Sequence, residues 1–181
     1  MDEELDLHPV LSAEPGVEGL RIGPEHRPEL KRLVLQDPEQ VQRILSAYSG
    51  MRNAQKEHVE VFKMHLIGRM DSCFYEVPEG LIYFTYIVPR YRAQFHVVFF
   101  DGKLRKDRIP LCVAAMQECV DDFDIRVFQT ELAAGNVPLR EFVKKLGFVW
   151  EGTQRRGWVD ETGISDKLLF GILSEEIDGS R

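Results

Sequence analysis

The amino-acid sequence predicts an α/β (α+β) fold: a single mixed sheet, largely antiparallel, with helices on both faces. Three observations support this class. Residues 81–88 and 94–100 are nearly continuous apolar and β-branched runs, which is typical of strands covered on both sides. Residues 109–120 and 137–146 instead place apolar side chains at helical spacing. These segments alternate within 181 residues, a length that suits one domain.

The N-terminal part begins with an acidic stretch. Residues 1–18 carry Asp and Glu with few apolar anchors, which predicts a flexible arm ahead of a domain over residues 19–177. The domain should open with a short strand at 19–23. A helix over 37–48 follows, because Asp37 can cap it and Pro38 suits its first position. A longer helix over 51–70 comes next.

The remaining elements are predicted from helical spacing of apolar residues and from continuous apolar runs. We expect the helix at 109–120 to bury Cys112 and Cys119, and the helix at 137–146 to begin after Asn136 and stop at Gly147. The polar segment that ends in a turn at Gly163 should join the last two strands. The expected strands are 73–76, 81–88, 94–100, 125–130, 148–150 and 167–173.

Composition excludes several classes of protein. The chain has 23 Lys and Arg against 30 Asp and Glu, a net charge of −7, which disfavours generic nucleic-acid binding. Three cysteines without a Cys-x-x-Cys pair exclude a disulfide scaffold or a four-cysteine zinc site. His58 and His65 lack partners at metal-ligand spacing, so no metal site is expected. No apolar run could span a membrane, and the acidic N-terminus is unlike a signal peptide, so we expect a cytoplasmic protein.

The C-terminal third resembles the GCN5-related N-acetyltransferase superfamily. The resemblance rests on Thr130-Glu-Leu-Ala-Ala-Gly-Asn136, on Phe142-Val-Lys-Lys-Leu-Gly-Phe148 and on Glu151-Gly152 at their spacings. It looks closest to the branch that modifies ribosomal-protein N-termini, whose last strand residues 165–171 also resemble. Small proteins encoded by bacteriophages have a similar look.

The resemblance implies a binding site for acetyl-CoA. In this family two neighbouring parallel strands splay apart, and the exposed backbone of the first binds the pantetheine amides as an added strand would. Here the first strand would be 94–100 and the second 125–131. The pyrophosphate would lie at the N-terminus of the next helix, where N–H groups favour an anion. The implied cofactor-binding residues are Phe95, Val97, Val98, Phe99, Lys103, Arg105, Lys106, Arg108 and Asn136.

Two positions depart from the family pattern. The loop at residues 103–108 has no glycine after Gly102, so its four cations would have to replace backbone contacts with phosphate. Alternatively, this loop is a solvated turn with Asp107 as a helix cap. Phe142 stands near the place of a Tyr that protonates the leaving thiolate in many relatives. Another acid or solvent would then have to protonate coenzyme A.

The base that accepts the proton of the attacking amine is expected near the splay. Glu131 is the first candidate, because it lies at a strand end next to Asn136, where sites form in open sheets. His96 is the second, because its intrinsic pKa suits the task, and Glu76 is also a candidate. Two of these candidates have structural alternatives: His96 as a hydrogen-bonded core residue and Glu131 as a surface carboxylate. The alternative role of Asn136 is a helix cap.

The function that these residues imply is acetyl-CoA-dependent acetyl transfer to a primary amine, on a small molecule, a protein N-terminus or a lysine. Trp150, Trp158, Arg155 and Arg156 would either line the acceptor groove or cover the sheet edge. The alternative function is a catalytically degenerate binding or assembly module with the same fold. A homodimer or a protein assembly partner is compatible with both functions.

Overall fold

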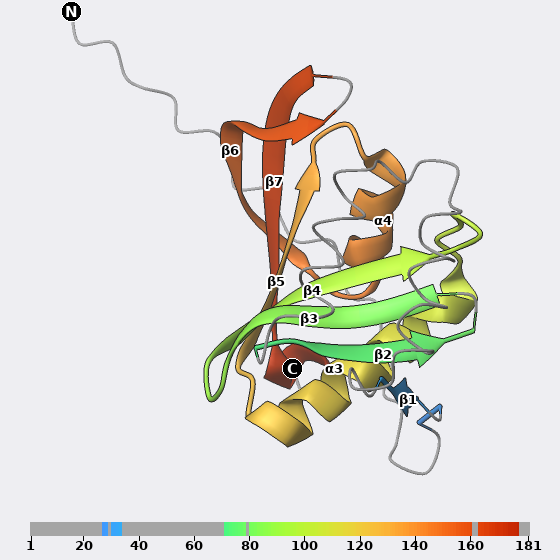
Figure 1. Ribbon diagram of the computed structural model, residues 1–181. Coiled ribbons are helices and arrows are strands. Elements are labelled where there is room, and N and C mark those ends of the chain that lie inside the picture. The colour runs from blue at the N-terminus through green and yellow to red at the C-terminus, as the bar shows by residue number, and fades with distance from the viewer. Residues whose placement is uncertain (1–26, 29, 34–70, 79, 161–162, 178–181) are drawn as a thin grey trace, which may run out of the picture.

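The computed structural model describes residues 27–28, 30–33, 71–78, 80–160 and 163–177 (Figure 1). The acidic arm expected over residues 1–18 lies outside these ranges, as do the strand at 19–23 and the helices at 37–48 and 51–70. These expectations therefore remain predictions, together with the helical cover of the second face of the sheet.

The structure confirms a single mixed sheet. Its seven strands are ordered β1-β2-β3-β4-β5-β7-β6, and every neighbouring pair is antiparallel except β4 with β5. The predominance of antiparallel pairs and the one parallel pair agree with the predicted class. The strands are β1 (Lys31–Arg32), β2 (Cys73–Val77), β3 (Gly80–Val88), β4 (Arg92–Phe99), β5 (Val127–Ala133), β6 (Val149–Asp160) and β7 (Gly163–Leu173).

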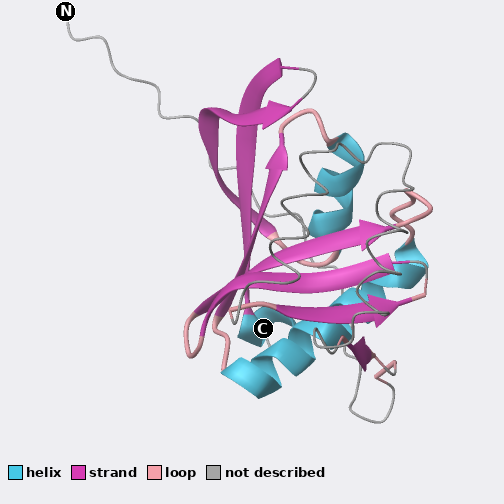
Figure 2. Ribbon diagram, in the orientation of Figure 1, coloured by secondary structure: helices cyan, strands magenta, loops and turns pink. Residues whose placement is uncertain are grey.

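The described helices pack on one face of this sheet (Figure 2). A short 3-10 turn, η2 (Lys106–Arg108), leads into α3 (Ile109–Phe123), and α4 (Val137–Lys145) and α5 (Ser174–Ile177) follow. All three α-helices contribute to one buried cluster with strand side chains such as Phe84, Phe95 and Phe128. The apolar runs that predicted the strands therefore supply the core.

The buried cysteines are part of this core. Cys112 and Cys119 are fully buried on α3, as their spacing predicted. Burial raises the pKa of the Cys112 thiol, and a hydrogen bond with Cys73 together with burial raises that of Cys119. Neither thiol is therefore a nucleophile at neutral pH.

The largest difference from the predicted elements is β6. The sequence predicts a strand only at 148–150, whereas β6 runs on through the polar residues to Asp160. Because β6 is the edge strand and most of its side chains are exposed, it needs no apolar alternation. The short β1 and α5 also carry no periodic signal, and β5 lies slightly later in the chain than expected.

The parallel strands β4 and β5 form a fork. They pair at Arg92–Val127, Ala93–Phe128 and Gln94–Gln129, and the pairing then stops. Beyond that point β4 continues to Phe99 and β5 to Ala133, and the two strands diverge in Figure 1. The predicted splay of adjacent parallel strands is thus observed. From here on, "the fork" means these diverging segments, 95–99 and 130–133.

Candidate functional site

A cavity of about 340 Å³ lies at the base of the fork. The last paired residues, Gln94 and Gln129, both line it, so the cavity begins where the β4–β5 ladder ends. Its lining is mainly polar or charged, which suits a reaction between polar groups. The lining residues are Tyr86, Arg92, Ala93, Gln94, Gln129, Thr130, Glu131, Glu151, Leu169 and Phe170.

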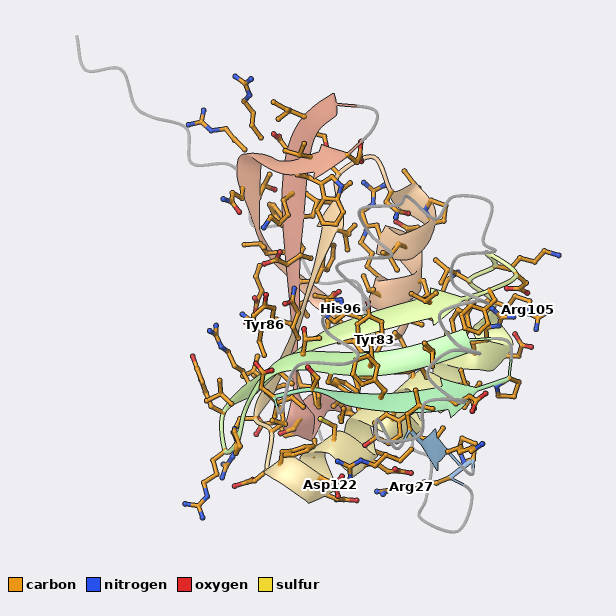
Figure 3. The ribbon with its side chains drawn as sticks, in the orientation of Figure 1. Arg27, Tyr83, Tyr86, His96, Arg105 and Asp122 are labelled. Carbon is orange, nitrogen blue, oxygen red and sulfur yellow. The ribbon has the colours of Figure 1, made fainter. Side chains whose placement is uncertain are left out.

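Tyr86 reaches this cavity because β3 is irregular there. The register of β3 with β4 shifts between Thr85 and Val88, and Tyr86 has a φ of +50°. A Tyr in the left-handed region is uncommon, and such residues concentrate at functional sites. Figure 3 shows Tyr86 close to the base of the fork, while Arg105 lies at the far end of β4.

Glu131 is a cavity residue, where it was expected. It lies on β5 in the fork, opposite Leu169 of β7, and its side chain is 38% exposed. Its Oε2 accepts a hydrogen bond of 2.9 Å from Nζ of Lys167. The carboxylate is thus fixed by an ion pair yet open to solvent on the cavity side.

His96 is not among the residues that line the cavity. Its Nε2 lies 2.8 Å from Oγ1 of Thr85, and its ring stacks on Tyr83 with centroids 4.7 Å apart. Figure 3 shows the two rings next to each other over β3 and β4. This environment matches the hydrogen-bonded alternative for His96. Glu76, the remaining candidate, lies on β2, two strands away from β4, and pairs with Lys31.

Glu151 is a cavity residue that was not considered as a site residue. It is the extra residue of a β-bulge, because Trp150 pairs with Phe170 and Gly152 pairs with the next residue, Leu169. The bulge turns the Glu151 side chain over the sheet and into the cavity. The signal that could have identified it is a glycine within the apolar strand β7, since such glycines mark close approach.

The loop after β4 is organised around Arg108. Its guanidinium donates to both carboxylate oxygens of Asp101, at 2.8 and 2.7 Å, and to the carbonyl of Lys103 at 2.7 Å. It also lies over the ring of Phe99, 4.1 Å from the centroid. The side chain of Arg108 is only 3% exposed. Arg108 therefore fixes the loop from inside, instead of presenting its charge to solvent.

Asp101 is the anion at the centre of this loop. It also accepts a hydrogen bond of 3.0 Å from the backbone N–H of Lys103. The hydrogen bond from Arg108, followed by that from Lys103, lowers the pKa of Asp101 from its usual 3.8 to about 2. The carboxylate consequently stays ionised throughout the physiological range.

The other three loop cations point outward. Lys103, Arg105 and Lys106 are exposed ahead of α3. Arg105 is 49% exposed and forms an ion pair of 3.3 Å with Asp107, which does not cap a helix as had been suggested. These cations and the N-terminal N–H groups of α3 together form an electropositive end of the fork.

Helix α4 fills the space beneath the fork. Asn136 caps it by accepting a hydrogen bond of 3.2 Å from the N–H of Leu139, as predicted for a cap. Phe142 is 3% exposed and packs edge-on against Phe99, with centroids 6.3 Å apart. Phe148, just after the helix, packs against Phe95 of β4.

The four β4 residues predicted to bind the cofactor are all in the fork. The side chains of Phe95 and Phe99 are buried in the core, and those of Val97 and Val98 are half-buried. On one side these residues pair with β3. On the other side, no strand of the described chain pairs with them, so an extended ligand could bind there.

Four β6 residues that were considered for the acceptor groove do not line the cavity. Trp150 is exposed on β6, and the indole N–H of Trp158 donates to Asp160 at 3.1 Å. Asp166 accepts from the backbone N–H of Arg156 at 2.8 Å. None of Trp150, Trp158, Arg155 and Arg156 lines the cavity, so within the described residues they lie at the sheet edge.

Among the described residues, no group of three or more His, Cys, Asp or Glu is placed to hold a metal ion. None of the helices in those same ranges is long and apolar enough to cross a membrane.

Comparison with known proteins identifies structural neighbours only. No protein-family profile matches the sequence, and no curated protein sequence matches it. Solved structures of spermidine N-acetyltransferase from Vibrio cholerae do match. A mutant form has a TM-score of 0.62 at 16% identity, covering 82% of this chain and 96% of that chain.

Other forms of that enzyme match with similar TM-scores and sequence identities. A chimera of the Vibrio cholerae enzyme has a TM-score of 0.66 at 15% identity, with 82% and 98% of the two chains covered. A dodecameric structure has a TM-score of 0.63 at 15% identity, with 82% and 94% covered. The chain therefore has the fold of the GCN5-related N-acetyltransferase superfamily.

Proposed function

We propose that the protein is an N-acetyltransferase that uses acetyl-CoA and a primary amine. The observation that carries this proposal is the fork of β4 and β5, with a polar cavity at its base and exposed cations at its far end. An extended, amide-containing molecule with a phosphorylated end fits this arrangement. The structural neighbours support the same chemistry.

The co-substrate would lie along the open edge of β4. Its pantetheine amides would pair with backbone groups of residues 95–99, as an added strand does. Its phosphates would bind the side chains of Lys103, Arg105 and Lys106. We assign Arg108 a positioning role, because its charge is already bound to Asp101. Asn136 both caps α4 and stands at the second arm of the fork.

The reaction is a direct attack. The amine nitrogen attacks the thioester carbonyl, the C–N bond forms, and the C–S bond breaks. We assign Glu131 as the group that accepts the amine proton, with His96 as the second candidate, because only Glu131 of the two lines the cavity. Phe142 has no proton to donate, so solvent would protonate the thiolate of coenzyme A.

We propose a small aliphatic amine as the acceptor. The neighbours named above are spermidine N-acetyltransferases, and two carboxylates line the cavity. A protein N-terminus, as the resemblance to the ribosomal-protein branch suggests, is the alternative acceptor. A cytoplasmic location, a homodimer and an origin in a bacteriophage remain predictions.

The first test is binding and turnover of acetyl-CoA. At one hundred times its Kd, a ligand adds about 2.7 kcal/mol of stability, or roughly 5–10 °C in Tm for a chain of this size. Transfer to an amine panel is followed by release of free coenzyme A and by the mass of the product. No stabilisation and no transfer would overturn the proposal. Stabilisation without transfer would favour the degenerate binding module.

The second test addresses the base. Glu131→Gln should reduce kcat by roughly two to four orders of magnitude while the Kd of acetyl-CoA changes little. Glu141→Gln is the matched control, because Glu141 is an exposed carboxylate on α4 that also pairs with a lysine, Lys144. Near-full turnover of the Glu131 variant would transfer the role to His96 or to solvent.

A further inference from the structure

The bulge in β6 places a carboxylate in a space left by a glycine. A Cβ added to Gly171 would collide with Oε1 of Glu151 and lie 2.6 Å from its Cδ. The Glu151 carboxylate therefore rests directly on the backbone of β7 at Gly171. Any larger residue at this position would displace it.

None of the described residues neutralises the charge of Glu151. Within the part of the chain that the structure describes, its carboxylate makes no hydrogen bond or ion pair, unlike Glu131 with Lys167. The one cation among the cavity-lining residues, Arg92, lies over the ring of Tyr91 instead. Glu151 is exposed, and its carboxylate lies at the cavity without a counter-charge from the described residues, so it is available to bind a cation.

The strand register fixes the spacing of the two cavity carboxylates. Gly171 pairs with Gln129, and Glu131 is two residues further along β5 on the same face. Gly171 and Glu131 are therefore diagonal neighbours across the paired strands, and such positions lie about 7–8 Å apart. This is comparable to the separation of the two nitrogens in a short aliphatic diamine. Arg92 lies at the opposite end, two residues before Gln94.

We infer that Glu151 binds a second ammonium group of the acceptor, so that the site selects diamines over monoamines. This inference rests on the proposed function, because Glu131 is taken to receive the proton of the reacting amine. Glu151 is then a specificity-determining residue. Its charge contributes to binding of the acceptor but not to the chemical step.

The test compares two ligands and four proteins. The ligands are 1,4-diaminobutane and 1-aminobutane, which differ only in the second amine. The proteins are the wild type, Glu151→Gln, Gly171→Ala and Gly152→Ala. Gly171→Ala keeps the carboxylate but displaces it, and the displaced atoms belong to a flexible side chain, so the fold should tolerate it. Gly152→Ala is the matched control, because its added Cβ meets nothing within 4 Å.

The measurements are acetyl-transfer kinetics at saturating acetyl-CoA and calorimetric titration of each amine in the presence of coenzyme A. For 1,4-diaminobutane, Glu151→Gln and Gly171→Ala should raise KM and Kd roughly fivefold, with kcat nearly unchanged. For 1-aminobutane, and for Gly152→Ala with either ligand, the values should stay within about twofold of the wild type.

The outcomes separate the inference from the proposed function. Equal wild-type preference for the two amines, or an unchanged diamine KM in both variants, would overturn the role of Glu151 while leaving acetyl transfer intact. An equal loss of kcat with both amines would also overturn it, because Glu151 would then act in the chemical step. Diamine binding that weakens in both variants, without any transfer by the wild type, would overturn the proposed function alone. Absence of both amine binding and transfer would overturn both.

Discussion

The exposed loop cations offer the sharpest prediction about the co-substrate. Replacing Arg105 and Lys106 together by Gln removes two charges from the far end of the fork without touching the buried Arg108. An exposed ion pair contributes about 0.5–1 kcal/mol, or two- to fivefold in affinity. Arg105 should lie at the lower end, because Asp107 already competes for it at 3.3 Å. The double variant should therefore weaken coenzyme A binding roughly four- to tenfold.

The assay is isothermal titration at low and moderate ionic strength, with two ligands. The loss should shrink as salt rises, since the Debye length falls to about 10 Å at 0.1 M. Pantetheine, which lacks the phosphates, should bind the variant and the wild type equally. The control is Arg90→Gln with Arg126→Gln, which removes the same charge near the opposite end of β4. Unchanged coenzyme A affinity, or an equal loss for pantetheine, would refute the assignment of these cations to phosphate.

Three further predictions concern the elements that build the fork. Asp101→Asn should remove the stability that the wild type loses as pH falls from 3.8 towards 2, because the folded pKa of Asp101 is lowered to about 2; parallel acid-unfolding curves would contradict this. Gly80→Ala should destabilise the fold by about 1–3 kcal/mol in urea unfolding, because its Cβ would lie 2.5 Å from the backbone oxygen of Val98; an unchanged midpoint would show that β3 shifts freely. Asn136→Ala should lower the free energy of unfolding by about 1 kcal/mol through loss of the hydrogen bond from Leu139, and Asn136→Ser should restore it. If the Ser variant regains stability but binds acetyl-CoA more weakly, Asn136 also contacts the cofactor. If it regains both stability and acetyl-CoA affinity, Asn136 acts only as the helix cap.

The strands β3 and β4 could be predicted because their sequences are predominantly apolar. The runs at 81–88 and 94–100 have few polar interruptions, and the observed β3 and β4 begin and end close to them. The position of Glu131 followed from the strand before it. In contrast, β6 is an exposed edge strand, and its polar sequence carries no signal that distinguishes it from a loop.

The roles of Arg108 and Glu151 depended on geometry that the sequence does not specify. Four cations between residues 103 and 108 look equivalent, yet one of them turns inward because Asp101 and Phe99 bind it there. Glu151 reaches the cavity only because a bulge shifts the register of β6 by one residue. Local patterns do not predict such shifts, although Gly171 within an apolar strand was a usable hint.

The central claim, that acetyl-CoA lies in the fork, is tested most directly by amide hydrogen exchange with and without acetyl-CoA. Bound pantetheine should slow exchange at residues 95–99, and bound phosphates should slow it at 103–108 and at the start of α3. Exchange in β1 and β2, on the other side of β3, should change little. Protection confined to other parts of the chain, or no change at saturating acetyl-CoA, would contradict the claim.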